Sequence, residues 1–157
     1  MSSVLEFKTF EETKPDKIHA FLNQYQYKPF GYFIKDDLLL TEYLRARLSL
    51  IAGNNNEVIV ASSGDSVVAL AALEVLPWDS EHFGFNCGKI SYLVALGDYA
   101  FQSGVFDSLK PHLERWAGLN KIRFLSVKCN SFDIAAIHFL ERWGAKLMDD
   151  ELTLAYL

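Results

Sequence analysis

Residues 58–73 read VIVASSGDSVVALAAL, and this stretch decides the fold that the sequence predicts. Two apolar runs, 58–61 and 67–73, flank a short polar segment that contains Gly64. Apolar runs of this length, separated by a short glycine-containing turn, are typical of a β-hairpin. The second run continues as far as Pro77, which is expected to end the strand because proline cannot donate to a strand ladder.

Toward the amino terminus, the sequence predicts one strand followed by two helices. Residues 4–10 alternate between apolar and polar side chains, as in a half-buried strand. Apolar residues then recur at helical spacing in residues 18–25 and again in residues 40–51. Pro29 and Gly31 are expected to separate these two helices.

Toward the carboxyl terminus, strands alternate with helices. Residues 89–96 and 124–129 are strand-like, and residues 105–116 between them carry an apolar face at helical spacing. Pro111 lies within this helix. It is expected to kink the helix or to delay its start, because proline has no N–H and clashes with the preceding turn.

A final helix and two closing strands complete the predicted order. Asn130 or Ser131 is expected to cap the helix, and Gly144 to end it. Residues 145–148 and 152–157 are predicted to be the closing strands. The order β-α-α-β-β-β-α-β-α-β-β predicts a mixed α/β sheet with helices on both faces.

Length and composition restrict the class of protein. The chain has 157 residues, which fits one domain, and its 50% apolar content excludes a disordered chain. Its net charge of −5 lacks the basic excess typical of nucleic-acid-binding domains. No apolar run approaches the ~20 residues of a membrane span, and residues 1–20 hold no apolar signal-peptide core. We therefore expect a cytoplasmic protein without nucleic-acid or membrane partners.

Cysteine and histidine usage predicts no metal site. Two cysteines, Cys87 and Cys129, are too few for a cysteine-based zinc site, and both are expected to be buried or idle thiols. His19, His112 and His138 lack carboxylate or cysteine partners at metal-ligand spacing.

Two further stretches resemble a known family. Residues 126–145, SVKCNSFDIAAIHFLERWGA, are similar to the strand–Asn–helix region that ends in YEKLGF in the GNAT N-acetyltransferase superfamily. Residues 76–85, LPWDSEHFGF, are similar to a PWDSEFFG segment of bacterial dTDP-fucosamine acetyltransferases. In those proteins the segment lies in an amino-terminal GNAT-like half, and a second half with the working acetyl-CoA site follows. The order of elements resembles the superfamily over nearly the whole chain.

The resemblance implies a single GNAT-like domain over residues 1–157. Its sheet is expected to be mixed and mostly antiparallel, with helices on both faces. Strands 90–96 and 124–129 are expected to be adjacent and parallel, and to splay apart near Leu96 and Cys129 into a V-shaped cleft. The resemblance also implies acetyl-CoA as cofactor and a small-molecule amine as acceptor, with an amino sugar as the more specific expectation. The cofactor contacts that it implies are Val94, Ala95, Leu96, Gly104, Val105 and Asn130.

Two positions depart from the superfamily pattern. The pyrophosphate loop, R/Q-x-x-G-x-G/A, corresponds to residues 101–106, where Phe106 replaces the second small residue and Phe101 replaces Arg or Gln. Such a loop binds an anion through backbone N–H groups that glycine leaves accessible. Leu140 stands where many members have a general-acid tyrosine. These departures predict a degenerate cofactor loop, with weak or absent acetyl-CoA binding by this chain.

The segment that resembles PWDSEFFG has two interpretations. In the structural one, Trp78 and Phe83 anchor a loop to the core, Asp79 accepts backbone N–H groups, and Gly84 relieves a tight backbone approach. In the functional one, Glu81 is a candidate general base.

Two functional hypotheses remain open. The first is an enzyme that transfers an acetyl group from acetyl-CoA to an amine. The second is a non-catalytic GNAT-like domain, the front part of a longer two-domain acetyltransferase. For the second, the aromatic residues between positions 25 and 33 offer a surface for a second GNAT-like domain or for a homodimer mate.

Overall fold

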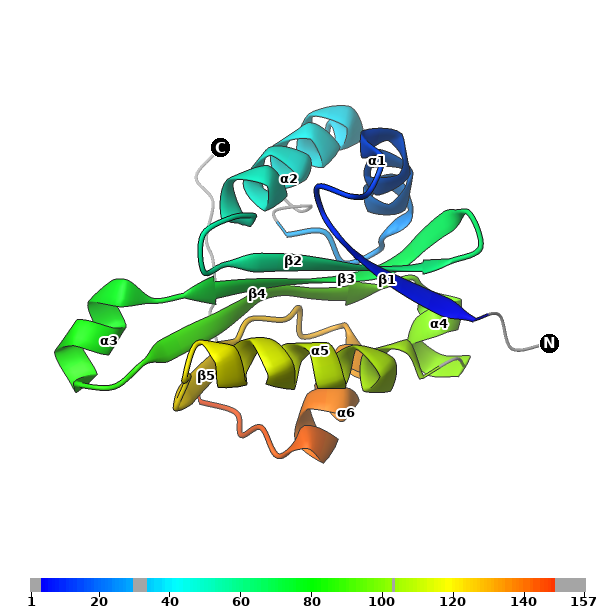
Figure 1. Ribbon diagram of the computed structural model, residues 1–157. Coiled ribbons are helices and arrows are strands. Elements are labelled where there is room, and N and C mark those ends of the chain that lie inside the picture. The colour runs from blue at the N-terminus through cyan, green and yellow to red at the C-terminus, as the bar shows by residue number, and fades with distance from the viewer. Residues whose placement is uncertain (1–3, 30–33, 103, 149–157) are drawn as a thin grey trace.

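The computed structural model describes residues 4–29, 34–102 and 104–148. The predicted strand 152–157 and most of the aromatic segment around Gly31 lie outside the described residues. The described part of the chain forms a sheet between two helical layers (Figure 1).

The strands of this sheet lie in their chain order. They are β1 (Leu5–Thr9), β2 (Glu57–Ser63), β3 (Ser66–Val75), β4 (Cys87–Ala95) and β5 (Phe124–Val127). Neighbouring strands pair antiparallel from β1 to β4, whereas β5 runs parallel to β4. The predicted hairpin is therefore confirmed as β2 and β3, and the mostly antiparallel, mixed sheet is confirmed as well.

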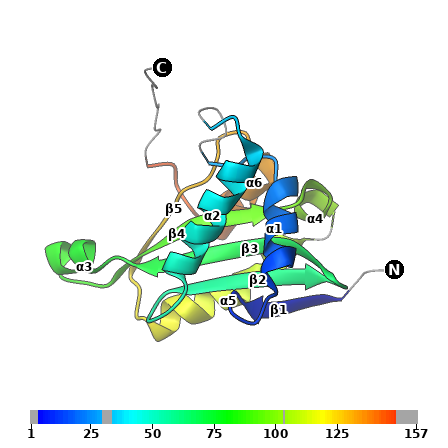
Figure 2. The same cartoon turned by 90° about the horizontal axis from the view of Figure 1, so that it is seen from above.

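The helices cover both faces of the sheet, as the sequence predicted. Helices α1 (Pro15–Gln24) and α2 (Asp37–Ile51) pack on one face, and α5 (Val105–Leu119) and α6 (Ile134–Trp143) on the other (Figure 1). Two short helices that the sequence analysis missed, α3 (Pro77–Phe83) and α4 (Gly97–Gln102), lie at opposite ends of β4 (Figure 2).

Strand β3 lies at the centre of the molecule, because both of its faces are covered. Val67, Leu70 and Ala72 belong to the cluster under α1 and α2, while Ala71 and Leu73 belong to the cluster under α5 and α6. A strand buried on both sides needs an unbroken apolar run rather than an alternating one. This requirement explains why residues 67–73 carry no polar side chain.

A tight contact joins α5 to the start of β4. A β-carbon on Gly88 would lie 3.0 Å from Trp116 Cη2 and 3.2 Å from Ile122 Cδ1. Trp116 is buried, and its indole N–H donates to the Asn55 carbonyl at 2.8 Å, which fixes the ring. Glycine is therefore required at position 88 for space.

Several predicted details of the helices are wrong. Helix α5 begins at Val105 with Pro111 inside it, so of the two expected effects of the proline, a kink or a delayed start, the delayed start is wrong. Helix α6 is capped by Asp133 instead of Asn130 or Ser131: the Asp133 carboxylate accepts the Ala136 N–H at 3.2 Å. Residues 145–148, predicted to be a strand, follow the left-handed Gly144 cap as irregular backbone.

The segment 77–84 forms a helix that projects beyond the sheet (Figure 2). The prediction that Trp78 and Phe83 anchor it is wrong, since their exposed fractions are 71% and 56%. Ser80 provides the attachment instead, donating to the Leu76 carbonyl at 2.7 Å and accepting the Cys87 N–H at 2.8 Å. Gly84 ends the helix with φ 73°, and nothing lies near its β-carbon position, so its conformation rather than a close approach requires glycine.

We expect Gly88→Ala to destabilise the protein by about 1–3 kcal/mol, because the added methyl group overpacks a contact in which Trp116 is fixed. Urea unfolding measures the change. Gly118→Ala is the matched control: position 118 is exposed on α5 and its β-carbon position is open. There alanine should stabilise by about 0.5–1 kcal/mol. Equal effects at both sites would contradict the packing of Trp116 on Gly88.

We expect Trp78→Ala to change the free energy of unfolding by less than about 0.5 kcal/mol, because an exposed side chain away from the core contributes little. Thermal unfolding of this variant, beside Trp116→Ala, provides the comparison. Trp116→Ala should cost about 3–5 kcal/mol, as do other large core truncations. A comparable loss at Trp78 would show that its ring is buried in solution.

Candidate functional site

The site begins where β5 leaves β4. The two strands pair through Cys87–Phe124, Gly88–Leu125, Lys89–Ser126 and Ile90–Val127, and the Lys128 N–H then donates to the Ile90 carbonyl at 3.2 Å. Strand β4 continues to Ala95, still paired with β3. The predicted splay is therefore present, but the separation starts at Ile90, well before Leu96.

The free half of β4 directs backbone groups into this splay. The Leu96 N–H donates to the Val68 carbonyl at 2.9 Å, so the backbone N–H of Leu96 points toward β3. Antiparallel partners alternate between hydrogen-bonded and non-bonded pairs, which turns Ala95 and Leu93 away from β3. Their N–H and C=O groups face the side that β5 has left. This edge could hydrogen-bond an extended amide-containing ligand as another strand would.

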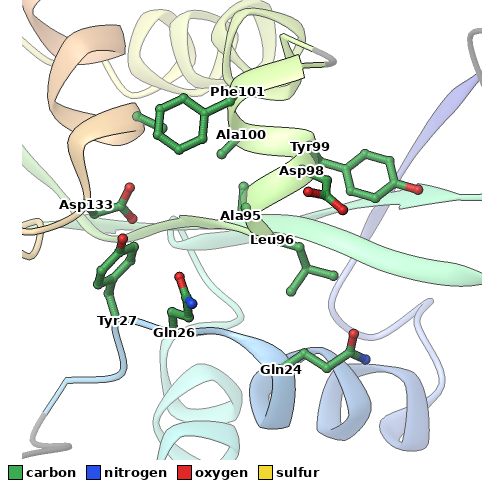
Figure 3. Close-up of a pocket in the computed structure, with 12 residues that line it drawn as sticks. Gln24, Gln26, Tyr27, Ala95, Leu96, Asp98, Tyr99, Ala100, Phe101 and Asp133 are labelled. Carbon is green, nitrogen blue, oxygen red and sulfur yellow. The ribbon is translucent and has the colours of Figure 1, made fainter.

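A pocket of about 390 Å³ lies at the same end of β4 (Figure 3). Three parts of the chain meet there: the end of α1 with the residues that follow it, the β4–α4 junction, and the start of α6. The lining residues are Gln24, Gln26, Tyr27, Ala95, Leu96, Gly97, Asp98, Tyr99, Ala100, Phe101, Asp133 and Ala135.

Asp133 supplies a buried carboxylate to this pocket, with an exposed fraction of 4%. One carboxylate oxygen accepts the Ala136 N–H at 3.2 Å as the helix cap, and the other accepts the Tyr25 hydroxyl at 3.0 Å. Tyr25 ends α1 and is itself buried, with its ring 6.1 Å from that of Tyr27. The carboxylate therefore has a fixed orientation.

Burial raises the pKa of Asp133 above its usual range, although the bonds from Ala136 and Tyr25 act in the opposite direction. The pKa of Tyr25 is raised by its burial and by the adjacent Asp133 carboxylate, so this phenol remains protonated. The pocket therefore holds a carboxyl group whose proton affinity exceeds that of an ordinary aspartate.

The start of α5 is a second feature of the site. Gly104 is the N-cap, with φ 61°, and as a glycine it has no side chain with which to cap the helix. Phe106 does not lie over this end: its ring is 2% exposed and stacks on Phe139 in the core at 5.6 Å. The nearby carboxylate is that of Asp107, which would lie 3.7 Å from a β-carbon on Gly104 and pairs with Arg142 at 3.3 Å.

The structure brings together part of the predicted site. Ala95 and Leu96 line the pocket, and Val94 is buried beside them on β4. Gly104 and Val105 form the start of α5.

Asn130 lies in the turn before α6, where its side chain accepts the Phe132 N–H at 2.9 Å. Glu81 is exposed on α3, at the far end of β4 from the pocket. Nine strand residues separate these ends, about 30 Å. Of the two thiols expected to be buried or idle, Cys87 is buried and Cys129 is exposed.

Sequence reasoning missed Asp133, Tyr25 and the pocket residues of α4. A signal for Asp133 was present, because aspartate directly before an apolar helical run is a strong N-cap residue. Nothing in the sequence indicates that Tyr25 reaches Asp133, 108 residues away. Leu140, at the position of the superfamily's tyrosine, packs in the core.

No group of three histidine, cysteine, aspartate or glutamate side chains is placed to hold a metal ion in the described ranges of the chain. No helix in these ranges has the length and apolarity needed to cross a membrane.

The arrangement of sheet, helices and splayed parallel strands is the GNAT fold. No family model matches the chain, and no curated protein matches its sequence. Solved structures match over nearly the whole chain. A transcriptional regulator from Bacillus halodurans C-125 is 16% identical, with a TM-score of 0.68 over 98% of this chain and 100% of its own.

Two acetyltransferases are similar in the same way. The ribosomal-protein-alanine N-acetyltransferase from Brucella melitensis is 14% identical, with a TM-score of 0.65 over 98% of this chain and 100% of its own. The aminoglycoside 6'-N-acetyltransferase from Acinetobacter haemolyticus is 12% identical, with a TM-score of 0.65 over 97% and 98%. At these identities the likeness establishes the fold.

We expect Tyr25→Phe to lower the free energy of unfolding by about 1.5–3 kcal/mol at neutral pH, because it removes a buried hydrogen bond to a carboxylate. The Tyr25 hydroxyl stabilises the ionised form of Asp133, so its loss raises the pKa of Asp133 further. The cost should therefore shrink as pH falls through that pKa toward about 4, the ordinary carboxyl range.

Urea unfolding across this pH range measures the effect. Tyr92→Phe is the control, since the Tyr92 hydroxyl is hydrogen-bonded to Arg47, which stays charged throughout. A pH-independent cost at Tyr25 would mean that its partner is not an ionised carboxylate.

Proposed function

We propose that this chain is an acetyl-CoA-dependent N-acetyltransferase whose acceptor is a small polar amine, with an amino sugar as the specific expectation. The observation that carries this proposal is the meeting of two features at Ala95. The backbone edge facing the splay ends there, and the acidic pocket opens there. A thioester held along the edge and an amine held in the pocket would therefore share one corner of the fold.

The residues present fit acetyl-CoA in two places. Leu93 and Ala95 offer strand-type donors and acceptors to the amide-containing arm of the cofactor. The start of α5, whose N-cap Gly104 carries no side chain, would bind the pyrophosphate through the helix dipole and its first backbone N–H groups. When bound, acetyl-CoA supplies an activated acetyl thioester. The contribution of the chain is to hold that group and to polarise its carbonyl with a backbone N–H.

The buried position of Phe106 removes the steric argument against cofactor binding. Its ring packs on Phe139 in the core instead of lying over the Gly104 N-cap of α5. One electrostatic factor still weakens acetyl-CoA binding: the Asp107 carboxylate lies beside Gly104 and repels a pyrophosphate. We therefore expect acetyl-CoA to bind weakly rather than not at all.

The pocket favours a polar, cationic acceptor. Asp98 and Asp133 supply carboxylates, while Gln24, Gln26 and Tyr27 supply amide and hydroxyl groups suited to a hydroxylated molecule. Leu96 and Phe101 add apolar surface for the face of a ring. This combination suits an amine on a polyhydroxylated scaffold more than an apolar amine.

Calorimetric titration with acetyl-CoA, together with a thiol-release assay, tests the proposal. The amines are D-glucosamine, kanamycin and a peptide with a free amino-terminal alanine. Weak binding of acetyl-CoA and turnover of at least one amine are expected. No detectable binding of acetyl-CoA would overturn the proposal.

We expect Asp107→Asn to tighten acetyl-CoA binding about two- to five-fold, because a carboxylate at a helix N-terminus opposes an anionic ligand by about 0.3–1 kcal/mol. S-acetylpantetheine, which lacks the pyrophosphate, is the control ligand, and its affinity should not change. An equal effect on both ligands would place the pyrophosphate away from α5.

The alternative, a non-catalytic GNAT-like domain, is favoured by a different observation. Helix α3 exposes Trp78, stacked on His82 at 5.4 Å, with Phe83 beside them. An exposed aromatic cluster is typical of surfaces that contact another protein domain. A chain that binds no acetyl-CoA would favour this alternative.

A further inference from the structure

The pocket at the end of β4 carries negative charge on opposite sides. Asp133 lies at the start of α6 and Asp98 on α4, across the pocket (Figure 3). No lysine, arginine or histidine is among the described residues that line it. The ligand group that complements such a pocket is a cation.

The two carboxylates differ in their surroundings. Asp98 is exposed on a short helix, so water screens its charge. Asp133 is the buried carboxylate among the described residues, and it is fixed by bonds from Ala136 and Tyr25, one to each oxygen. Each carboxylate oxygen has two acceptor positions, so Asp133 can accept a further donor from the pocket without giving up either bond.

Building on the proposed function, we propose that Asp133 receives the acceptor amine: its carboxylate binds the substrate ammonium in the pocket and removes one proton from the nitrogen. Tyr25 is the positioning residue that holds the carboxylate for this contact. The Asp133 carboxylate, which caps α6, is thus also the group that deprotonates the substrate amine.

The proton transfer is a simple exchange. An N–H bond of the ammonium breaks, its electron pair stays on nitrogen, and an O–H bond forms on a free acceptor position of Asp133. The neutral amine is the nucleophile, and Asp133 later returns its proton to water. Burial raises the pKa of Asp133 toward that of an ammonium group, which makes the transfer less unfavourable than it would be to an ordinary aspartate.

The titratable groups that face Asp133 are neutral, so its carboxylate supplies the charge on its side of the pocket. Tyr25 faces it from α1, and Cys129 from the segment after β5. The pKa of Tyr25 is raised by burial and by Asp133, and that of the exposed Cys129 thiol by partial desolvation and by Asp133, so both are neutral at pH 7. Tyr27 is the neighbouring phenol, and Asp98 is the like charge across the pocket. An ammonium group between the carboxylates would relieve their repulsion.

Asp133→Asn tests this role, because asparagine keeps the shape and caps a helix equally well but cannot accept the proton. We expect the acetyl-CoA affinity to remain unchanged and the protein to stay folded, with a lower melting temperature because the single amide oxygen cannot accept from both Ala136 and Tyr25. The kcat/KM for the amine should fall about 100-fold or more. The fall of wild-type kcat/KM at low pH, which reports protonation of Asp133, should disappear.

Asp36→Asn is the matched control. Asp36 caps α2 in the same way, accepting the Leu39 N–H at 3.0 Å, but it is exposed and does not line the pocket. Its kcat/KM should stay within about two-fold of wild type. Tyr25→Phe should retain activity but move the low-pH fall to higher pH, because it removes a bond to the ionised carboxylate.

A second measurement does not need the cofactor. D-glucosamine, kanamycin and the alanyl peptide are titrated calorimetrically into the protein without acetyl-CoA. The wild type should bind at least one probe, and Asp133→Asn should weaken that binding about ten-fold.

The outcomes separate the two proposals. If wild type turns over an amine and Asp133→Asn does so equally well, Asp133 is a structural cap and this inference is wrong, while the acetyltransferase function stands. If no acetyl-CoA binds, the function fails, and the amine titration still decides whether Asp133 holds an ammonium. A wild type that binds none of the probes and acetylates none overturns the inference.

Discussion

The short pairing of β5 with β4 is the constraint on which the site depends. Four residue pairs join the strands, after which β4 continues as an edge beside open space. An exposed strand edge normally invites association with other chains. Here α1 packs on one face of the sheet and α6 on the other, so the free edge of β4 lies between two helical layers (Figure 1).

Asp133 joins two demands that usually fall on different residues. As a helix cap it must accept a backbone N–H, and as a buried carboxylate it needs donors that offset the loss of water. The Tyr25 hydroxyl meets the second demand and links the first helix of the chain to the last described one. The same bond closes the pocket wall between the two helical layers, so the geometry of the pocket depends on the fold as a whole.

The sequence predicted the sheet better than the site, for physical reasons. The runs 58–61 and 67–73, with Gly64 between them, are local signals, and the strands they predict are present. Pairing of β4 with β5 came from the resemblance to the GNAT superfamily, since parallel strands leave no local signature. Trp78 was misassigned because an indole is usually buried, and α3 fits no core-facing pattern. The position of Phe106 in the loop pattern predicts an obstruction, because spacing alone does not show that its ring turns into the core. The bond between Tyr25 and Asp133 spans 108 residues, which no periodicity encodes.

The chain order of the strands has a consequence for the order in which the molecule assembles. Strands β2, β3 and β4 are joined by short connections, so their pairing closes small loops at little entropic cost. Strand β5 and the Asp133 cap of α6 follow α4 and α5 in the chain, and the bond between Asp133 and Tyr25 closes a loop of more than a hundred residues. Loop closure before contact formation slows such long-range steps. We expect the hairpin core to form early. The pocket should be completed last, when the end of α1 and the start of α6 come into contact through Tyr25 and Asp133.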